Sequence, residues 1–255
     1  MRYIGEYIDT VSSTNTTVFI IGESGVGKRL IAKTIHDRSR RSDRAFVKVD
    51  CVALSGSLLE RELFGYEKGA ISGTSGCRKG SLEIADGGTI FLEEIQALSP
   101  LLQAKLSLVL KNREFERIGG NQPIKIGTRI ISATTQDLEE RMDQGKFNKD
   151  LYYELNVFPI VVPPLRERRQ DILLLANCFV EEYASELGKK KPKISAEAID
   201  ALMNYRWPGN VQELKGCIER AMILSTNDMI HLHHLPPGML ASLFNGEVNN
   251  SNECE

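Results

Sequence analysis

A glycine-rich run, GESGVGK, is the part of the sequence whose residue types and spacing point most directly to chemistry. Its glycines allow backbone N–H groups to turn inward around phosphate oxygens, and the lysine at its end can reach the outer phosphates of a nucleotide. The apolar segment TVFII precedes the run and the helically patterned segment LIA follows it, which is the strand–loop–helix context that a phosphate loop requires. We therefore predict a loop that binds ATP or ADP. The predicted nucleotide-binding residues are Gly22, Glu23, Ser24, Gly25, Val26, Gly27, Lys28 and Arg29.

Two acids, Glu93 and Glu94, supply the second half of such a site. They follow the apolar segment TIFL, and at a strand end of this kind the first acid holds Mg²⁺ through water while the second orients an attacking water molecule. We predict Glu93 as the Mg²⁺ residue and Glu94 as the catalytic residue. Arg29 stands where a Ser or Thr hydroxyl usually binds magnesium, so the metal has to be held from elsewhere.

The strands that position these residues are predicted by short apolar segments rich in β-branched or aromatic residues, at 17–21, 45–49, 89–92 and 128–133. Helical patterning between the segments favours an α/β fold, in which a parallel sheet is sandwiched by helices. One helix has a clear beginning, because Ser99 can cap its N-terminus and Pro100 suits its first position.

A second, smaller part is predicted after residue 165. The segment FPIVVPPL at 158–165 contains three prolines, which cannot continue a helix, and beyond it residues 172–187, 196–203 and 211–224 have helical patterning. We predict an α/β subdomain at 1–165, an α-helical lid at 166–240 and a disordered polar tail at 241–255.

The overall composition excludes several classes of protein. The chain of 255 residues is 42% hydrophobic and 26% charged with a net charge of −2, which gives no bulk attraction to nucleic acid or membranes. Its five cysteines are an odd number without paired short spacings, as in reduced cytoplasmic proteins. Neither a signal peptide nor an apolar run of about 18 residues is found, so we expect a cytoplasmic protein with no membrane partner.

Five motifs in order resemble the AAA+ central domain of bacterial enhancer-binding proteins, the sigma-54 transcription activators: GESGVGK, ELFGYEKGA, GGTIFLEEI, DLYYELNVFPIVVPPLRERRQDI and WPGNVQEL. The resemblance implies a P-loop AAA+ fold and a homo-oligomeric ring, a hexamer or a dimer, with nucleotide at the subunit interface. It also implies sigma-54 RNA polymerase as the partner that ATP hydrolysis remodels. Family members usually add a sensory domain and a helix-turn-helix. We recognise neither here, so we expect either a central domain cut from a longer regulator or a free-standing relative without a DNA-binding domain.

The resemblance places the loop that touches the sigma factor at Gly69, Ala70, Ile71, Ser72, Gly73 and Thr74. The family sequence there is GAFTGA, so Ile71 replaces an aromatic residue and Ser72 replaces a threonine. Aromatic side chains are typical anchors of protein interfaces, so this replacement predicts weaker engagement of sigma-54.

Four further positions depart from the family pattern: Asp50, Asn148, Glu154 and Gln212. The resemblance places two arginine fingers at 148 and 154, a phosphate-sensing lid arginine at 212, and an asparagine that positions the catalytic acid at 50. An arginine finger is worth about 10³–10⁵ in rate, or roughly 4–7 kcal/mol of activation free energy. We therefore predict a nucleotide-binding domain with weak or absent ATP hydrolysis.

Two other hypotheses remain open at this stage. The first is an active ATPase that opens sigma-54 promoters with substitute residues, and the second is an interaction module without nucleotide turnover. The run RERR at 166–169 is compatible with ion pairs at the domain boundary or with nucleotide sensing. A polar sensor is also plausible at Thr134 and Thr135, at the end of the fourth predicted strand.

Overall fold

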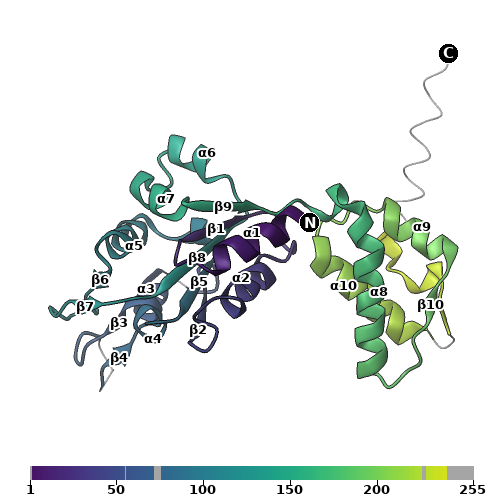
Figure 1. Ribbon diagram of the computed structural model, residues 1–255, viewed down its shortest axis with the longest axis horizontal. Coiled ribbons are helices and arrows are strands. Elements are labelled where there is room, and N and C mark those ends of the chain that lie inside the picture. Colours follow the sequence, from purple (N-terminus) through teal and green to yellow (C-terminus); the bar gives the residue numbers. More distant parts are fainter. Residues whose placement is uncertain (1, 55, 72–75, 226–227, 240–255) are drawn as a thin grey trace, which may run out of the picture. The chain divides into compact units, whose positions relative to one another are not determined.

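The computed structural model describes residues 2–54, 56–71, 76–225 and 228–239, so the predicted tail at 241–255 lies outside the described residues. The chain divides into two compact units. The first contains Met1–Glu23 and Lys28–Val162, and the second contains Ser24–Gly27 and Pro163–Glu255. Each unit is described separately below (Figure 1).

Within the described residues, five strands form the central sheet of the first unit, in the order β2-β5-β8-β1-β9, and all four pairings are parallel. The strands are β1 (Val18–Ile21), β2 (Phe46–Asp50), β5 (Thr89–Glu93), β8 (Arg129–Thr134) and β9 (Phe158–Val161). The helices of this unit are α1 (Arg2–Ser12), α2 (Lys28–Asp37), α3 (Gly56–Phe64), α4 (Ser81–Ile84), α5 (Pro100–Asn112), α6 (Leu138–Asp143) and α7 (Lys149–Leu155). This architecture confirms the predicted α/β fold with a parallel sheet sandwiched by helices.

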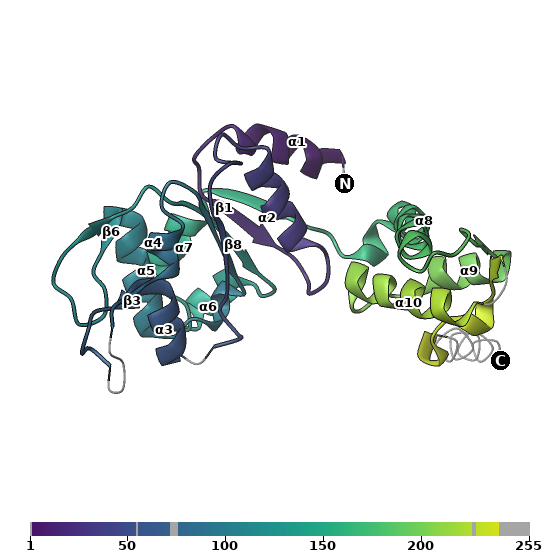
Figure 2. The ribbon, with the colours of Figure 1, turned by 90° about the horizontal axis from the view of Figure 1, so that it is seen from below.

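The helices cover both faces of the sheet, with α1 and α2 on one face and α3 to α7 on the other (Figure 2). Side chains alternate between the faces along each strand, because successive Cβ atoms of a strand point in opposite directions. In β5, Ile90 and Leu92 join the core formed with α3 to α7, whereas Phe91 is buried but does not belong to that core. Since both faces of the sheet are covered, the strand sequences are apolar almost throughout rather than alternating.

The edge strand β9 (Phe158–Val161) was not predicted, because the prolines of this segment suggested only an interruption. Pro159 is tolerated because β9 pairs with a single neighbour, β1, so a residue of this strand can face outward without donating a ladder hydrogen bond. The predicted start of α5 is confirmed, since the Ser99 side chain accepts a hydrogen bond from the Leu102 amide and Pro100 is the first residue of the helix.

Two short antiparallel ladders belong to the first unit. β3 (Gly65–Tyr66) pairs with β4 (Arg78–Lys79), and β6 (Glu114–Phe115) pairs with β7 (Ile124–Lys125). A single 3₁₀ turn at Ile95–Ala97 follows β5. These small elements carry the loops that lie outside the central sheet.

The second unit is mainly helical, as predicted for the lid. It contains α8 (Arg169–Glu186), α9 (Ala196–Asn204) and α10 (Asn210–Leu224), the short parallel ladder of β10 (Lys193–Ile194) with β11 (Met229–Ile230), and 3₁₀ turns at Leu165–Glu167 and Leu232–His234. Trp207 is fully buried at its centre, and the indole Nε1–H donates to the Leu202 carbonyl at 2.9 Å. Among the described residues, none of the helices combines the length and the apolar character that crossing a bilayer requires.

His36 couples the stability of the first unit to pH. Its imidazole is buried, and Nδ1 lies 3.0 Å from the Thr89 hydroxyl. Burial lowers the pKa of His36 and the Lys33 ammonium lowers it further, while Asp37 acts in the opposite direction. Because the folded-state pKa is below the unfolded one, the unfolded chain takes up a proton first as the pH falls. Stability is therefore lost as the pH drops from the unfolded pKa through the folded pKa.

We expect the free energy of unfolding to decrease as the pH is lowered from about 7.5 to about 5.5, and to decrease less in a His36→Gln variant. Denaturant unfolding followed by circular dichroism measures both slopes. Identical pH dependence in the wild type and His36→Gln would contradict this role of His36.

Candidate functional site

The glycine loop connects β1 to α2, and its conformation depends on glycine at two positions. Gly25 has φ of 76° and Gly27 has φ of 104°, in the left-handed region that other residues rarely adopt. Helix α2 begins at Lys28, so the loop ends at a helix N-terminus, where backbone N–H groups and the helix dipole favour an anion. The loop therefore has the geometry of a phosphate-binding site.

The Lys28 side chain is held by backbone carbonyls of the glycine loop. Nζ donates to the carbonyls of Gly22 at 2.8 Å and Glu23 at 3.1 Å, and lies 3.5 Å from Oε1 of Glu94. Burial lowers the pKa of Lys28, whereas Glu94 raises it. The Lys28 ammonium is thus fixed in place, and the Glu94 carboxylate partly neutralises its charge.

Glu93 ends β5 with its carboxylate engaged by two cations. Oε2 of Glu93 lies 3.2 Å from the Arg29 guanidinium and 3.0 Å from the Lys48 ammonium. Asp50 is the register partner of Glu93 on β2, and its Oδ1 accepts the Val52 amide at 3.0 Å. Glu93 and Asp50 are therefore like charges on adjacent strands, and the two cations offset their repulsion.

Glu94 has the features of an oriented catalytic carboxylate. Its φ of 57° is strained for a non-glycine residue, and such strain concentrates at functional sites. Oε2 accepts hydrogen bonds from the Thr135 hydroxyl at 2.7 Å and from the Gln96 amide at 2.5 Å. The sequence suggested a polar sensor at the end of β8, and the structure places Thr135 on Glu94 in that position. Gln96 itself was not anticipated, because its contact depends on the 3₁₀ turn after β5.

In the second unit, the first residues of α10 donate hydrogen bonds to the tip of the glycine loop. The amides of Val211 and Gln212 both donate to the Gly25 carbonyl, at 3.0 and 3.3 Å. The buried Asn210 side chain donates to the Ser24 carbonyl at 2.9 Å and accepts from the Leu165 amide at 2.7 Å. The predicted sensor position, Gln212, is thus adjacent to the loop.

Arg168, within the run RERR, also reaches the loop. Its guanidinium donates to the Val26 carbonyl at 3.0 Å and lies 3.8 Å from Asp171. The side chain is only 8% exposed, so its methylenes and its charge are both enclosed by the second unit. This contact is structural, and a nucleotide-sensing role of the run stays a prediction.

Asn148 and Glu154 lie at the two ends of α7. Asn148 is the N-cap, because its side-chain oxygen accepts the Leu151 amide at 2.9 Å, and its own amide donates to Gln103 at 2.7 Å. Glu154 is half-buried in the last turn of the same helix. Neither position supplies a cation, and Asn148 has a structural task that an arginine would not perform.

The surface loop that follows β3 is described only as far as Ile71, so Ser72, Gly73 and Thr74 lie outside the described residues. Its first part is held by Arg117, whose guanidinium binds Glu83 through both carboxylate oxygens at 2.8 to 3.0 Å and Glu67 at 2.9 Å. The Glu67 amide donates to the Ile118 carbonyl at 3.0 Å. Gly119, with φ of 74°, is so close to Ala70 that an added Cβ would lie 2.5 Å from the Ala70 Cβ. The loop from 117 to 120 therefore supports the loop that contains Ile71.

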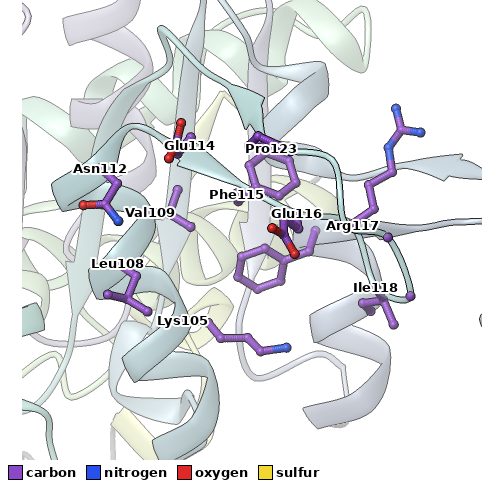
Figure 3. Close-up of a pocket in the computed structure, with 13 residues that line it drawn as sticks. Lys105, Leu108, Val109, Asn112, Glu114, Phe115, Glu116, Arg117, Ile118 and Pro123 are labelled. Atoms are coloured by element: carbon purple, nitrogen blue, oxygen red, sulfur yellow. The ribbon is translucent and has the colours of Figure 1, made fainter.

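A cavity of about 510 Å³ lies behind this supporting loop, between α5 and the β6–β7 hairpin. Figure 3 shows Lys105 and Leu108 of α5 on one side, with Phe115 and Ile118 on the hairpin side. The hairpin is thus incompletely packed against α5, and the ion pairs of Arg117 are among the interactions that hold it.

The comparisons with known proteins agree with this geometry. Residues 1–161 match the family model described as the Sigma-54 interaction domain, and residues 166–251 match the AAA+ ATPase lid domain. The match confirms the family predicted from the five motifs.

Several known proteins resemble the chain over most of its length. It is 52% identical to the nitrogen fixation protein AnfA of Azotobacter vinelandii over 246 residues, which is 96% of this chain and 46% of that protein. It is 50% identical to the Nif-specific regulatory protein of Klebsiella pneumoniae over 249 residues, which is 95% of this chain and 47% of that protein. The crystal structure of NtrX from Brucella abortus in complex with ADP matches with a TM-score of 0.88 at 35% identity, over 94% of this chain and 54% of that one. The chain thus spans about half the length of the curated relatives it matches.

We expect Gly25→Ala to loosen the start of α10 from the loop. A Cβ at this position would lie 2.2 Å from the Gly209 carbonyl oxygen, and the left-handed backbone alone costs about 1–3 kcal/mol for a non-glycine residue. Hydrogen exchange of the Val211 and Gln212 amides should become at least about tenfold faster. Gly27→Ala separates the clash from the strain, because its φ of 104° is also left-handed but an added Cβ there meets nothing within 4 Å, so the two amides should accelerate less. Unchanged exchange of the two amides in Gly25→Ala would refute the contact.

We expect Arg117→Gln to release the loop that precedes Ile71. The change removes charge-assisted hydrogen bonds to Glu67 and Glu83, at a cost of about 1–3 kcal/mol. Hydrogen exchange of the Glu67 amide should therefore accelerate. Arg78→Gln is the matched control, because Arg78 makes an exposed ion pair with Glu62 that contributes little. Equal effects of the two variants would show that Arg117 has no special role.

Proposed function

Since the chain belongs to the family of sigma-54 interaction domains, we propose that it binds ATP or ADP at residues 22–28 and hydrolyses ATP weakly or not at all. The observation that carries this proposal is the composition of α7. Both arginine-finger positions of the family lie on or next to this helix, and they hold the helix cap Asn148 and the acid Glu154. The chain therefore has phosphate-binding backbone without the cations that stabilise phosphoryl transfer.

Nucleotide binding is supported by the loop itself. Phosphate binding depends on the backbone shape of this loop, which is set by the left-handed Gly25 and Gly27 and by the helix N-terminus at Lys28. The substitutions at 148, 154 and 212 do not change these residues. NtrX of Brucella abortus, whose fold is similar, has been crystallised with ADP and with ATP. By analogy we assign the same class of ligand to this chain.

Weak hydrolysis follows from the charge near the outer phosphates. In a phosphoryl transfer, negative charge spreads over the oxygens of the transferred group, and arginines stabilise it. Here Gln212 is neutral, Asn148 is neutral and Glu154 is an acid, so three expected guanidinium groups are replaced. Losing one finger costs about 10³–10⁵ in rate.

An active ATPase is the second candidate, and one observation favours it. Glu94 is fixed by Thr135, Gln96 and Lys28, as a residue that orients a water molecule should be. The alternative of an interaction module without nucleotide turnover remains as the third candidate, and it predicts no nucleotide affinity.

The partners of the chain are proposed from its family. We propose a cytoplasmic homo-oligomer, in which neighbouring subunits share each nucleotide, and sigma-54 RNA polymerase as the target of the complete regulator. Ile71 stands where the family has an aromatic anchor, so we expect contact with the sigma factor to be weaker than in family members that keep this residue.

The experiment measures nucleotide affinity and steady-state hydrolysis on the same samples over a series of protein concentrations. We expect binding of ATP and ADP, with turnover at least about tenfold below that of a family member that has both arginines. Turnover within about tenfold of that member, rising steeply with protein concentration, would instead establish the active ATPase. Absence of nucleotide affinity would support the interaction module.

Introducing arginine at positions 154 and 148 tests whether the missing arginine fingers, rather than other substitutions, limit the rate of hydrolysis. Glu154→Arg removes an acid and adds a guanidinium without touching a helix cap. Asn148→Arg also removes the N-cap of α7, a loss of about 1 kcal/mol in stability. We expect turnover to rise in Glu154→Arg and further in the double variant. Tyr153→Arg is the control, because Tyr153 is an exposed residue of the same helix.

A further inference from the structure

Positively charged side chains occupy the place at which magnesium would bind. Mg²⁺ in nucleotide sites is held by one or two carboxylates together with the phosphates, and the carboxylates must be available to it. In this chain Glu93 is the acid at the magnesium position, and two cations already lie against its Oε2 atom. The residues present do not fit a magnesium site.

Arg29 and Lys48 reach Glu93 from two different elements. Arg29 is the second residue of α2 and occupies the position at which a hydroxyl would bind the metal, whereas Lys48 projects from β2. The Arg29 guanidinium lies 3.2 Å and the Lys48 ammonium 3.0 Å from the same carboxylate oxygen, and Glu93 is only 16% exposed. A divalent cation placed on this oxygen would be close to both positive charges, and like charges at such distances repel strongly where water is partly excluded.

The site carries cations of its own. Lys28 lies against Glu94, while Arg29 and Lys48 lie against Glu93. Arg29 is 62% exposed, so its side chain can turn to a bound phosphate while the less exposed Lys48 keeps its contact with Glu93. A guanidinium fork suits two phosphate oxygens, and a lysine ammonium acts as a point charge beside them.

We propose that this chain binds nucleotide without a divalent cation, because Arg29 and Lys48 provide the positive charge that Mg²⁺ supplies elsewhere. The proposal rests on the proposed nucleotide binding and narrows it to a metal-independent mode. It concerns affinity only, and it is independent of how fast ATP is hydrolysed.

The test is equilibrium binding of a fluorescent ADP analogue to the full chain, with MgCl₂ in one series and EDTA in the other. We expect the wild-type dissociation constant to change by less than about threefold between the two conditions. In an Arg29→Ser/Lys48→Ala double variant, EDTA should weaken binding by at least about tenfold, because Glu93 is then available to the metal. Arg44→Ser, which removes an exposed arginine that pairs with Asp43, should behave like the wild type.

A second measurement on the wild type does not depend on the variants. Mn²⁺ can replace Mg²⁺ as a paramagnetic probe, and the protein saturated with ADP should hold no more Mn²⁺ than the same concentration of ADP alone. Two results would overturn the proposal. One is binding of the analogue that weakens by about tenfold or more in EDTA, and the other is more Mn²⁺ bound by the complex than by ADP alone. A double variant that binds equally in both conditions would overturn the role of Arg29 and Lys48. Absence of binding in both conditions would instead contradict the proposed function.

Discussion

The parallel alignment of β1, β5 and β8 is the constraint on which the candidate site depends. The carboxyl ends of parallel strands meet at one edge of a sheet, and ligands of open α/β sheets bind there. The glycine loop leaves β1 at this edge, Glu93 ends β5 there, and Thr134 ends β8. Residues of three different segments therefore come close together: Glu94 lies 3.5 Å from Lys28 and accepts a hydrogen bond from Thr135 at 2.7 Å, although Thr135 is 41 positions away in the sequence.

The acids at this edge of the sheet are paired within the chain. Glu93 has Arg29 and Lys48 within reach, and Glu94 has Lys28 and Thr135. Such pairing satisfies partly buried charges, which would otherwise be costly. The proposals of weak hydrolysis and of metal-independent binding both depend on these pairs, because a bound nucleotide has to exchange contacts with the same side chains.

Hydrogen bonds hold the loops around the sheet, and many of them are accepted by backbone carbonyls. The tip of the glycine loop gives its Ser24, Gly25 and Val26 carbonyls to donors of the second unit. The loop before Ile71 is fixed by amides and by Arg117 rather than by an apolar core. Hydrogen-bonded loops of this kind open at lower free energy than the core, which suits segments that contact a ligand or a partner.

Local patterns were enough to predict the α/β class, the glycine loop, the helical second part and the two acids, because each depends on residues within one segment. The capping of α5 by Ser99 is such a pattern, and so is the family assignment from ordered motifs. The contact partners of these residues could be found in the three-dimensional structure alone. The pairing of Arg29 and Lys48 with Glu93, the hydrogen bond from Thr135 to Glu94 and the contact of Asn210 with Ser24 join segments that are distant in sequence. The edge strand β9 belongs to the same group, because a proline is compatible with a strand only where a neighbour is absent. Local patterns carry no information about such neighbours, since strand order and the packing of helices bring them together.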